Sequence, residues 1–273
     1  MTNHSTNQQG DFIWYELLTT DADGAGDFYG NVIGWTSMSA GQPDMDYRFF
    51  SSGDGSDIAD GVGGYMAITP EMADHGSQPC WLGYLAVDDV DASVASILSA
   101  GGAVHMPAID LPGVGRMAMV ADPQGAVFYV MRGASDETSH SFAAIEPKVG
   151  HCAWNELATS DQEAAKAFYG AQFGWAKDGE MDMGPMGKYE FMQASGGRFG
   201  VGAVMPVMPG QSGPAWTYYF RVADIDAGLA AITAHGGTIV QPPIEIPGGD
   251  FSLVAIDPAG ATFGLVGAPG DAK

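Results

Sequence analysis

The chain repeats itself, and this repeat constrains the fold more than any other feature. The segment Trp14 to Asp21 (WYELLTTD) matches Trp154 to Asp161 (WNELATSD) at a spacing of 140 residues, since 154 − 14 = 140. Further matches follow in the same order: FYG at 28–30 and 168–170, GW at 34–35 and 174–175, W at 81 and 216, DVD at 89–91 and DID at 224–226, and DP at 122–123 and 257–258. So many matches in one order predict two copies of one folding unit.

The matches also place the domain boundaries. A length of 273 residues is enough for two domains that each bury a core of their own. We expect a flexible tail over residues 1–10 and a first domain over 11–133. A linker of small and polar residues over 134–147 then leads to a second domain over 148–269.

The charge of the chain excludes two classes of partner. The net charge is −23, and only 10 residues are Lys or Arg. Nucleic acids and anionic membranes bind proteins through clustered basic residues, so neither is an expected partner. A solubility role explains the acidic surface without any partner.

The cysteines and the start of the chain bear on location. Cys80 and Cys152 lie in no zinc-binding or paired spacing, so no disulfide framework is expected. Residues 1–10 are polar and lack the apolar core of a signal peptide. No apolar run approaches the ~18 residues of a membrane span. We therefore expect a cytoplasmic protein.

Each copy combines strands with few helices. An apolar strand at 12–19 or 152–159 is followed by Asp21 or Asp161, where a helix cap is expected, and the helix should end near Gly34 or Gly174. Further strands are expected at 47–51, 62–68 and 82–87, with a helix at 90–100, and at 189–193, 201–207, 217–222 and 261–266. The order predicts two βαβββ modules per copy. This is an α+β fold in which eight strands form an incompletely closed barrel with outer helices and a concave cleft.

The repeated motifs are the Asp after the first strand, FYG, GW, DVD or DID, and the DP turn before the last strand. In this order they resemble the motifs of the vicinal-oxygen-chelate (glyoxalase/bleomycin-resistance/dioxygenase) superfamily. The Trp-x-Glu-Leu opening is similar to the tandem-domain, glyoxalase-like "hydroxylase" type of that superfamily. The resemblance covers nearly the whole chain twice. It implies a metal site built from strand positions. Those positions hold Trp14, Leu82 and Tyr129 in the first copy and Trp154, Thr217 and Gly264 in the second. The middle strands at 62–68 and 201–207 offer no further ligand.

The expected metal chemistry is therefore missing from these positions. Divalent metal centres of this kind need imidazole and carboxylate donors. We expect no metal and no other cofactor, and we do not expect the activity of a metal-dependent glyoxalase or dioxygenase. A metal enzyme with unusual ligands remains the third and weakest hypothesis.

Strand alternation predicts which side chains face the cleft. The predicted ligand-binding residues are Trp14, Tyr84, Tyr129, Trp154, Thr217, Tyr219, Arg221, Thr262 and Gly264. The second copy has the smaller side chains and should have the roomier pocket. Arg221 could pair with an anionic ligand or form a salt bridge to an acid of the chain. Tyr84 and Tyr219 could donate a hydrogen bond to a ligand or only pack, and Tyr47 and Tyr189 are predicted core residues.

Glu16 and Glu156 are the catalytic candidates. A carboxylate among apolar and aromatic groups should have a raised pKa, which suits a general acid or base. The competing interpretation is that each Glu only hydrogen-bonds a loop or a neighbouring domain.

Two function classes follow. The first is a metal-independent protein that binds and sequesters a flat, apolar or aromatic small molecule, as resistance-type members of the superfamily do. The alternative is a metal-free lyase or isomerase that acts on a carbonyl compound with Glu156 or Glu16 as acid and base. The sequence is also compatible with a homodimer.

Overall fold

The structure is a computed structural model that describes residues 7–41, 45–55 and 60–270. The first copy consists of β1 (Phe12–Thr19), α1 (Ala22–Ile33), β2 (Thr36–Ser39), β3 (Tyr47–Ser51), β4 (Gly61–Ala67), α2 (Pro70–Asp74), β5 (Cys80–Ala86), α3 (Val90–Ser99), β6 (Ala103–Leu111), β7 (Gly115–Ala121) and β8 (Val127–Gly133). The second copy consists of β9 (Cys152–Thr159), α4 (Gln162–Phe173), β10 (Ala176–Asp182), β11 (Lys188–Gln193), β12 (Gly200–Pro206), β13 (Ala215–Arg221), α5 (Ile225–Ala234), β14 (Thr238–Glu245), β15 (Phe251–Ile256) and β16 (Thr262–Gly267). Short 3₁₀ turns lie at Gly184–Met186 and Ser195–Gly197.

The strands form two mixed sheets of eight strands each. Their orders are β2-β3-β4-β1-β5-β8-β7-β6 and β10-β11-β12-β9-β13-β16-β15-β14, so each sheet is open at two edges. The predicted α+β class, with two similar copies and eight strands that do not close fully, is confirmed. The short helix α2 was not predicted, and β5 begins two residues earlier than expected.

The aspartates cap the helices as predicted. The carboxylate of Asp21 accepts a hydrogen bond from the Gly24 N–H at 2.9 Å, and that of Asp161 accepts one from the Ala164 N–H at 3.0 Å. Each helix ends at a glycine in the left-handed conformation, because Gly34 has φ 89° and Gly174 has φ 71°. A glycine there avoids the steric cost that a Cβ atom would bring.

The compact units of the structure do not follow the order of the chain. One unit consists of Met1–Ile13, Leu82–His140 and Asn155–Trp216. We call it the inner unit, because its two modules are the inner ones in the order of the chain. The other consists of Trp14–Trp81, Ser141–Trp154 and Thr217–Lys273, and we call it the outer unit. Each unit therefore combines one module from each copy. The domain boundaries at 133 and 148 stay a prediction that rests on the repeat alone.

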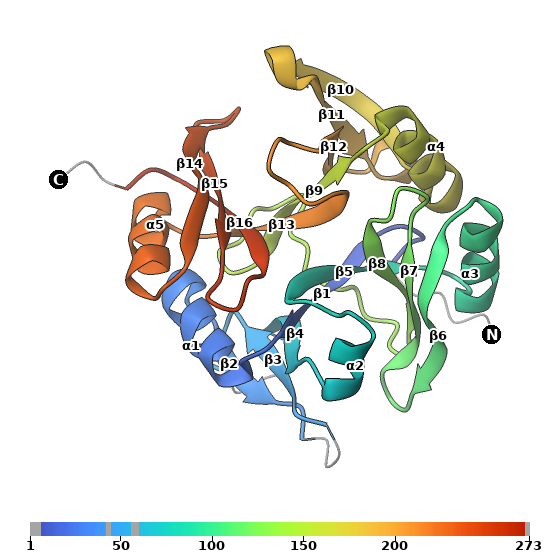
Figure 1. Cartoon of the computed structure of the whole chain (residues 1–273), viewed down its shortest axis with the longest axis horizontal. Coiled ribbons are helices and arrows are strands. Elements are labelled where there is room, and N and C mark those ends of the chain that lie inside the picture. Colours follow the sequence, from blue (N-terminus) through green and yellow to red (C-terminus); the bar gives the residue numbers. More distant parts are fainter. Residues whose placement is uncertain (1–6, 42–44, 56–59, 271–273) are drawn as a thin grey trace. The chain divides into compact units, whose positions relative to one another are not determined.

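The outer unit has an aromatic core around Tyr29. The Tyr29 ring lies 5.3 Å from Trp81 and 5.3 Å from Phe263 between ring centres. Its hydroxyl donates to Asp257 Oδ2 at 3.1 Å and accepts from Trp81 Nε1 at 2.8 Å. The helices α1 and α5 of this unit lie side by side (Figure 1).

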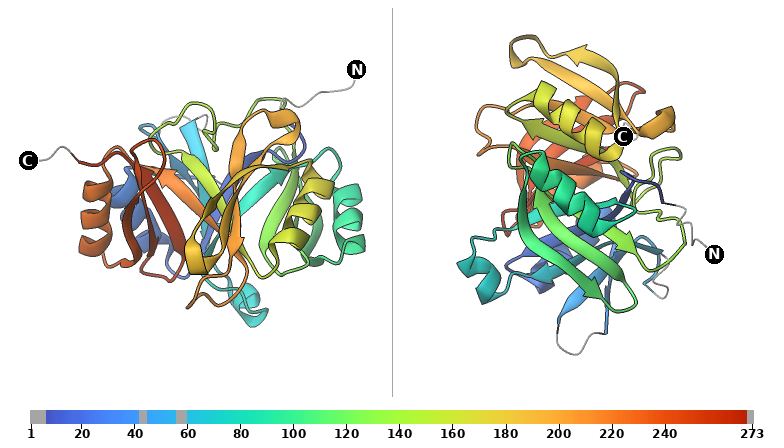
Figure 2. Two further views of the ribbon diagram at one scale, coloured as in Figure 1. Left: turned by 90° about the horizontal axis from the view of Figure 1, so that it is seen from above. Right: turned by 90° about the vertical axis from the view of Figure 1, so that its right-hand side faces the viewer.

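The inner unit repeats this arrangement around Tyr169. The Tyr169 hydroxyl donates to Asp122 Oδ2 at 3.1 Å and accepts from Trp216 Nε1 at 3.2 Å. The Tyr169 ring stacks on Trp175 at 5.2 Å. The helices α3 and α4 of this unit are neighbours, as the right-hand view of Figure 2 shows. The two units are thus built on the same polar contact inside an aromatic core.

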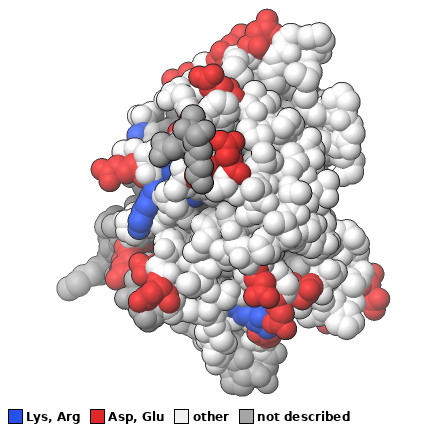
Figure 3. All heavy atoms as spheres, turned by 90° about the vertical axis from the view of Figure 1, so that its left-hand side faces the viewer, with Lys and Arg blue, Asp and Glu red and all other residues white. Residues whose placement is uncertain are grey.

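Only part of the predicted tail lies within the described residues, because residues 1–6 lie outside them. The Gly10 N–H donates to the Ala86 carbonyl at 2.8 Å, and the Gly10 carbonyl accepts from Trp175 Nε1 at 3.0 Å. Among the described residues, no helix is long and apolar enough to cross a membrane. Acidic groups are scattered over the face drawn in Figure 3, with few basic groups between them.

Candidate functional site

Glu16 lies at the centre of a polar group in the outer unit. It stands on β1, where it pairs in register with Gly64 of β4, and it is only 4% exposed. The hydroxyl of Tyr47, from β3, hydrogen-bonds to its carboxylate. The same hydroxyl accepts a hydrogen bond from Trp14 Nε1 at 3.0 Å. Trp14, Tyr47 and Glu16 therefore form a continuous polar chain, which we call the first-copy triad.

The position opposite Glu16 is a glycine, and the Tyr47 side chain lies over it. A Cβ atom at Gly64 would lie 2.0 Å from the Tyr47 hydroxyl oxygen, closer than any real contact. In the first copy the missing side chain leaves room for the Tyr47 ring where it crosses β4 to reach Glu16. Phe49, two residues farther along β3, packs edge-on against the Trp14 ring at 5.9 Å and supports its orientation.

The environment of Glu16 changes the acidity of its neighbours. Burial raises the pKa of Tyr47 well above its ordinary value, and the Glu16 charge raises it further. Burial, with a smaller effect of the Glu16 charge, raises the pKa of the Cys80 thiol to about 12. Both groups therefore keep their protons at neutral pH, so that Tyr47 can donate to the carboxylate.

The second copy retains the tyrosine–glutamate contact in the inner unit. Tyr189 of β11 donates from its hydroxyl to Glu156 Oε2 at 2.8 Å. Glu156 is half-buried, and it pairs in register with Ala203 rather than with a glycine. The neighbouring Asn155 is buried and donates to the Val201 carbonyl at 2.6 Å.

Tyr47 and Tyr189, predicted as core residues, are half-buried, and each of their hydroxyls meets one of the two candidate carboxylates. The two tyrosines match across the repeat, and this was the available signal. The face to which their strands turn these side chains depends on pairing register, which the sequence does not reveal.

Tyr84 and Tyr129, two of the predicted ligand-binding residues, lie against each other in the inner unit. They are register partners on β5 and β8, and their rings stack at 4.2 Å with an angle of 15°. Both are buried, with exposures of 3% and 4%. Each ring thus covers one face of the other.

Tyr219 and Gly264 occupy the corresponding positions in the outer unit. They are register partners on β13 and β16. A Cβ atom at Gly264 would lie 2.2 Å from the Tyr219 ring, so the ring covers the glycine. The space that a missing side chain leaves at Gly264 is therefore filled by Tyr219, and the expected extra room does not lie there.

The remaining predicted residues lie in different surroundings. Arg221 forms a salt bridge, donating from Nη1 to Asp250 Oδ2 at 2.8 Å, as its alternative interpretation held. Thr217 is buried, whereas Thr262 is exposed at the start of β16. Trp154 is half-buried on β9, and its carbonyl accepts a contact from Cys152 Sγ at 3.3 Å.

The donor chemistry does not fit a divalent metal at the positions that the resemblance implies. Those positions carry indole, aliphatic, phenol and hydroxyl side chains, or none, where imidazole and carboxylate would be needed. Within residues 7–41, 45–55 and 60–270, no three His, Cys, Asp or Glu side chains are grouped as a metal site. We therefore derive no step through a metal.

Comparison with known proteins decides the family. The profile of the Glyoxalase/Bleomycin resistance protein/Dioxygenase superfamily matches residues 148–265. "Putative glyoxylase CFP32" of Mycobacterium tuberculosis is 34% identical over 267 residues, which cover 97% of this chain and 98% of that protein. The chain belongs to this superfamily.

Other members of the superfamily resemble the chain over most of its length. "Anthracycline biosynthesis protein DnrV" of Streptomyces peucetius is 33% identical over 261 residues, or 93% of this chain and 91% of that protein. The Mn(II)-bound glyoxalase from Novosphingobium aromaticivorans has a TM-score of 0.60 at 18% identity, covering 97% of this chain and 85% of its own. The 2,2',3-trihydroxybiphenyl 1,2-dioxygenase from Sphingomonas wittichii has a TM-score of 0.62 at 13% identity, covering 96% of this chain and 91% of its own. The two solved structures share the fold.

Proposed function

We propose that the protein binds a flat, aromatic small molecule without a metal. The observation that carries this proposal is the first-copy triad: an indole stands where the resemblance implies a metal ligand, and it is hydrogen-bonded to a tyrosine that holds the buried Glu16. Aromatic faces supply affinity for flat rings, and a polar group fixes their orientation. The name of the relative DnrV, which refers to anthracyclines, supports a ligand of this shape.

The polar chain would select among flat ligands. Glu16 is an acceptor, and the Tyr47 hydroxyl can donate or accept, so the triad suits a ligand that carries a hydroxyl or carbonyl beside its rings. A purely hydrocarbon ligand would add no hydrogen bond to these polar groups and would keep water from those of their lone pairs that are still free.

A second candidate function is a metal-free lyase or isomerase. The tyrosine–glutamate contact occurs in both copies, at 2.8 Å for Tyr189 and Glu156. A carboxylate that shares a hydrogen bond with a phenol can take a proton next to a carbonyl and return it elsewhere, as general acid–base catalysis requires. The relative described as a glyoxylase supports a carbonyl substrate.

Binding is tested by titrating the full chain with an anthracycline such as doxorubicin and following tryptophan fluorescence. We expect saturable binding that Trp14→Leu weakens at least tenfold, because the indole face is lost. Trp216→Leu is not a suitable control, since it is buried in the core, so the exposed Val240→Ala serves instead. Equal affinity of Trp14→Leu and wild type would overturn the placement of the site.

Two variants, Glu16→Gln and Glu156→Gln, distinguish catalysis from binding alone. For each variant, affinity and turnover are measured with the bound compound in excess. A loss of turnover with affinity retained would favour catalysis. An absence of product in wild type after prolonged incubation would favour binding alone.

Metal independence is tested by elemental analysis and by thermal melts with Ni, Zn, Mn and Fe(II). We expect no stoichiometric metal and no rise in Tm. A tightly bound ion, or a Tm raised by several degrees through binding linkage, would overturn metal independence.

A further inference from the structure

A cavity of about 550 Å³ lies in the outer unit, between α1 and the strands β2 to β4. Its polar lining comes from Asp23, Asp27 and Asn31 on the helix and from Ser37, Arg48 and Tyr65 on the strands. Tyr65 follows Gly64 on β4, so its side chain points to the opposite face of the sheet from the Tyr47–Glu16 contact. The cavity is therefore separate from the candidate site.

The hydroxyl of Tyr65 is aimed into this cavity and lacks a partner. Tyr65 is 0% exposed, and its ring stacks on Phe50 at 4.2 Å. Among the described residues, no group meets hydrogen-bond geometry with its hydroxyl, although the Arg48 guanidinium lies close enough to interact with it. Leaving a buried hydroxyl unpaired costs free energy, so such a group calls for an explanation. A ligand in the cavity would supply the missing hydrogen bond.

A glycine keeps the space in front of this hydroxyl open. A Cβ atom at Gly26 would lie 2.8 Å from the Tyr65 hydroxyl oxygen and 3.1 Å from Ser37 Oγ. Any side chain at position 26 would therefore press on the hydroxyl or fill the cavity. No helix cap requires a glycine at position 26, because Gly26 lies inside α1, which begins at Ala22 and ends at Ile33.

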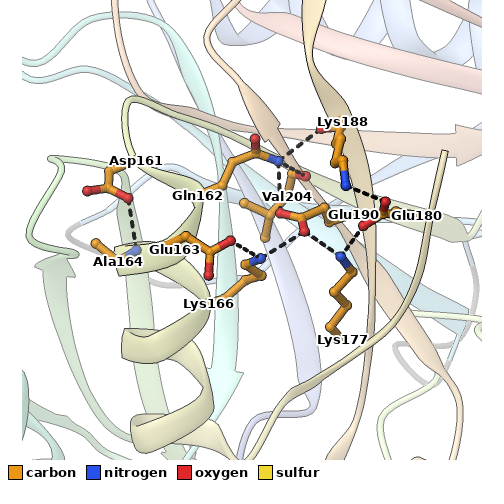
Figure 4. A network of polar contacts seen from close by, with 10 residues as sticks. All are labelled: Asp161, Gln162, Glu163, Ala164, Lys166, Lys177, Glu180, Lys188, Glu190 and Val204. Atoms are coloured by element: carbon orange, nitrogen blue, oxygen red, sulfur yellow. Dashed lines mark hydrogen bonds and ion pairs between the residues drawn. The ribbon is translucent and has the colours of Figure 1, made fainter. Parts of the chain in front are cut away.

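The second copy shows what fills the same place when the cavity is closed. The repeat and the strand registers align Gly26 with Lys166, Ser37 with Lys177, Arg48 with Glu190 and Tyr65 with Val204. In the inner unit, Lys166 Nζ donates to Glu163 at 2.6 Å and to Glu190 at 2.8 Å, while Lys177 Nζ donates to Glu190 at 2.7 Å (Figure 4). Two ammonium groups of the chain itself thus occupy this position.

The first copy has no ammonium group at these positions, Arg48 stands in place of Glu190, and α1 carries Asp23 and Asp27. Arg48 is already engaged by two acids, Asp23 at 2.6 Å and Asp46 at 2.7 Å. Asp27 is exposed at the cavity and forms no ion pair within the described part of the chain. The lining therefore has an uncompensated negative charge next to an unpaired hydroxyl, which is the environment that a cation with N–H donors satisfies.

We propose that this cavity binds a small primary alkylammonium compound, whose ammonium group takes the place that Lys166 holds in the second copy. Asp27 would supply the charge, and the oxygens of Tyr65 and Ser37 would accept hydrogen bonds from its N–H groups. This site goes beyond the proposed function, because it lies on the other face of the sheet and does not use Glu16.

The test uses n-butylamine at neutral pH, where it is an ammonium ion, and follows the amide signals of Gly26 and Ser37 by NMR. n-Butanol, of the same length and without charge, is the matched ligand control. We expect saturable shifts with the amine and none with the alcohol. Tyr65→Phe and Asp27→Asn should each weaken binding at least fivefold, whereas Asp178→Asn, an exposed carboxylate on β10, should leave it unchanged.

Two outcomes would overturn the proposal. If Asp178→Asn weakens binding as much as Asp27→Asn, the amine only follows the net negative charge. If the amine and the alcohol shift the same signals equally, no ammonium site exists. A double variant, Gly26→Lys with Tyr65→Val, introduces the second-copy residues at these two positions, fills the cavity with the new lysine side chain and should abolish binding. Should Tyr65→Phe fail to fold, the exposed Asp27 still carries the test.

Discussion

Tyr29 donates a hydrogen bond to Asp257 at 3.1 Å, although the two residues are 228 positions apart in the chain. The same hydroxyl accepts the Trp81 indole N–H at 2.8 Å, so it compensates two buried polar groups at once. Tyr169 has the same role toward Asp122 and Trp216. Each compact unit contains one such hydroxyl, bonded to one buried aspartate and one buried indole.

Tyr29→Phe should lower the free energy of unfolding by about 2–4 kcal/mol, because it removes the tyrosine donor from Asp257 Oδ2 and the acceptor from the buried Trp81 indole N–H. Urea denaturation followed by circular dichroism measures this loss. Tyr169→Phe is the matched variant and should have a similar effect. A loss below about 0.5 kcal/mol for either variant would show that its hydroxyl is dispensable.

The stability should depend on pH through Asp122 and Asp257. Burial raises the pKa of both carboxyls, and their hydrogen bonds offset this only in part. A folded-state pKa above the unfolded one stabilises the protein below the ordinary value of 3.8, and this contribution is lost as the pH rises through the raised pKa.

The measurement is the free energy of unfolding of wild type and of Asp122→Asn/Asp257→Asn at a series of pH values upward from 3.8. The stability of wild type relative to the variant should fall with pH across this window and level off above it. A relative stability that rises with pH would mean that hydrogen bonding outweighs burial at these carboxyls.

Tyr47 should resist ionisation. Its pKa is raised above the ordinary 10.0 by burial and by the Glu16 charge. Glu16→Gln removes that charge and should lower the pKa of Tyr47 without returning it to the ordinary value, because the burial remains. An ultraviolet titration compares each protein with its own Tyr47→Phe counterpart. An unchanged Tyr47 pKa in Glu16→Gln would place the carboxylate too far away to act.

Cys80 should react slowly with thiol reagents. Burial and the nearby Glu16 charge raise its pKa to about 12. Since only the thiolate reacts, alkylation at pH 8 should be about a thousandfold slower than that of a free cysteine. Cys152→Ala isolates Cys80 for the measurement, and Glu16→Gln should accelerate the reaction. A rate equal to that of a model thiol would contradict the assigned environment.

Tyr65→Phe should make the unliganded protein more stable by about 1 kcal/mol, because it removes a buried hydroxyl that lacks a partner. The stacking on Phe50 is retained in this variant. Thermal and urea denaturation without added amine measure the change. A clear loss of stability would reveal that the hydroxyl is bonded in solution.

Local patterns were sufficient to predict most of the fold. Asp21 and Gly34 mark the two ends of α1, because the Asp21 carboxylate caps the first turn and Gly34 takes the left-handed conformation after the last. The strand at 12–19 was predicted with its correct limits from apolar residues alone. These features depend on neighbours within a few residues, which a sequence displays directly.

The contacts between distant segments were not predictable in the same way. Tyr29 and Tyr169 belong to identical motifs, as do Asp122 and Asp257, so the repeat alone permits either pairing. Alternation along β1 identified Glu16 as a candidate. Its partner Tyr47 was assigned to the core, because the contact depends on a strand register that the sequence does not reveal.

Each compact unit contains one module from each copy, and this suggests how such a chain can arise. If the first copy existed alone, its Tyr29 would meet the Asp122 of a second molecule, because in the present chain each tyrosine finds its aspartate in the other copy. Fusing the two genes would convert that association into an intramolecular one, independent of protein concentration. The linker at 134–147 then replaces a dimerisation equilibrium. The two copies can diverge in sequence, and here the second copy has lysines where the first copy has a cavity.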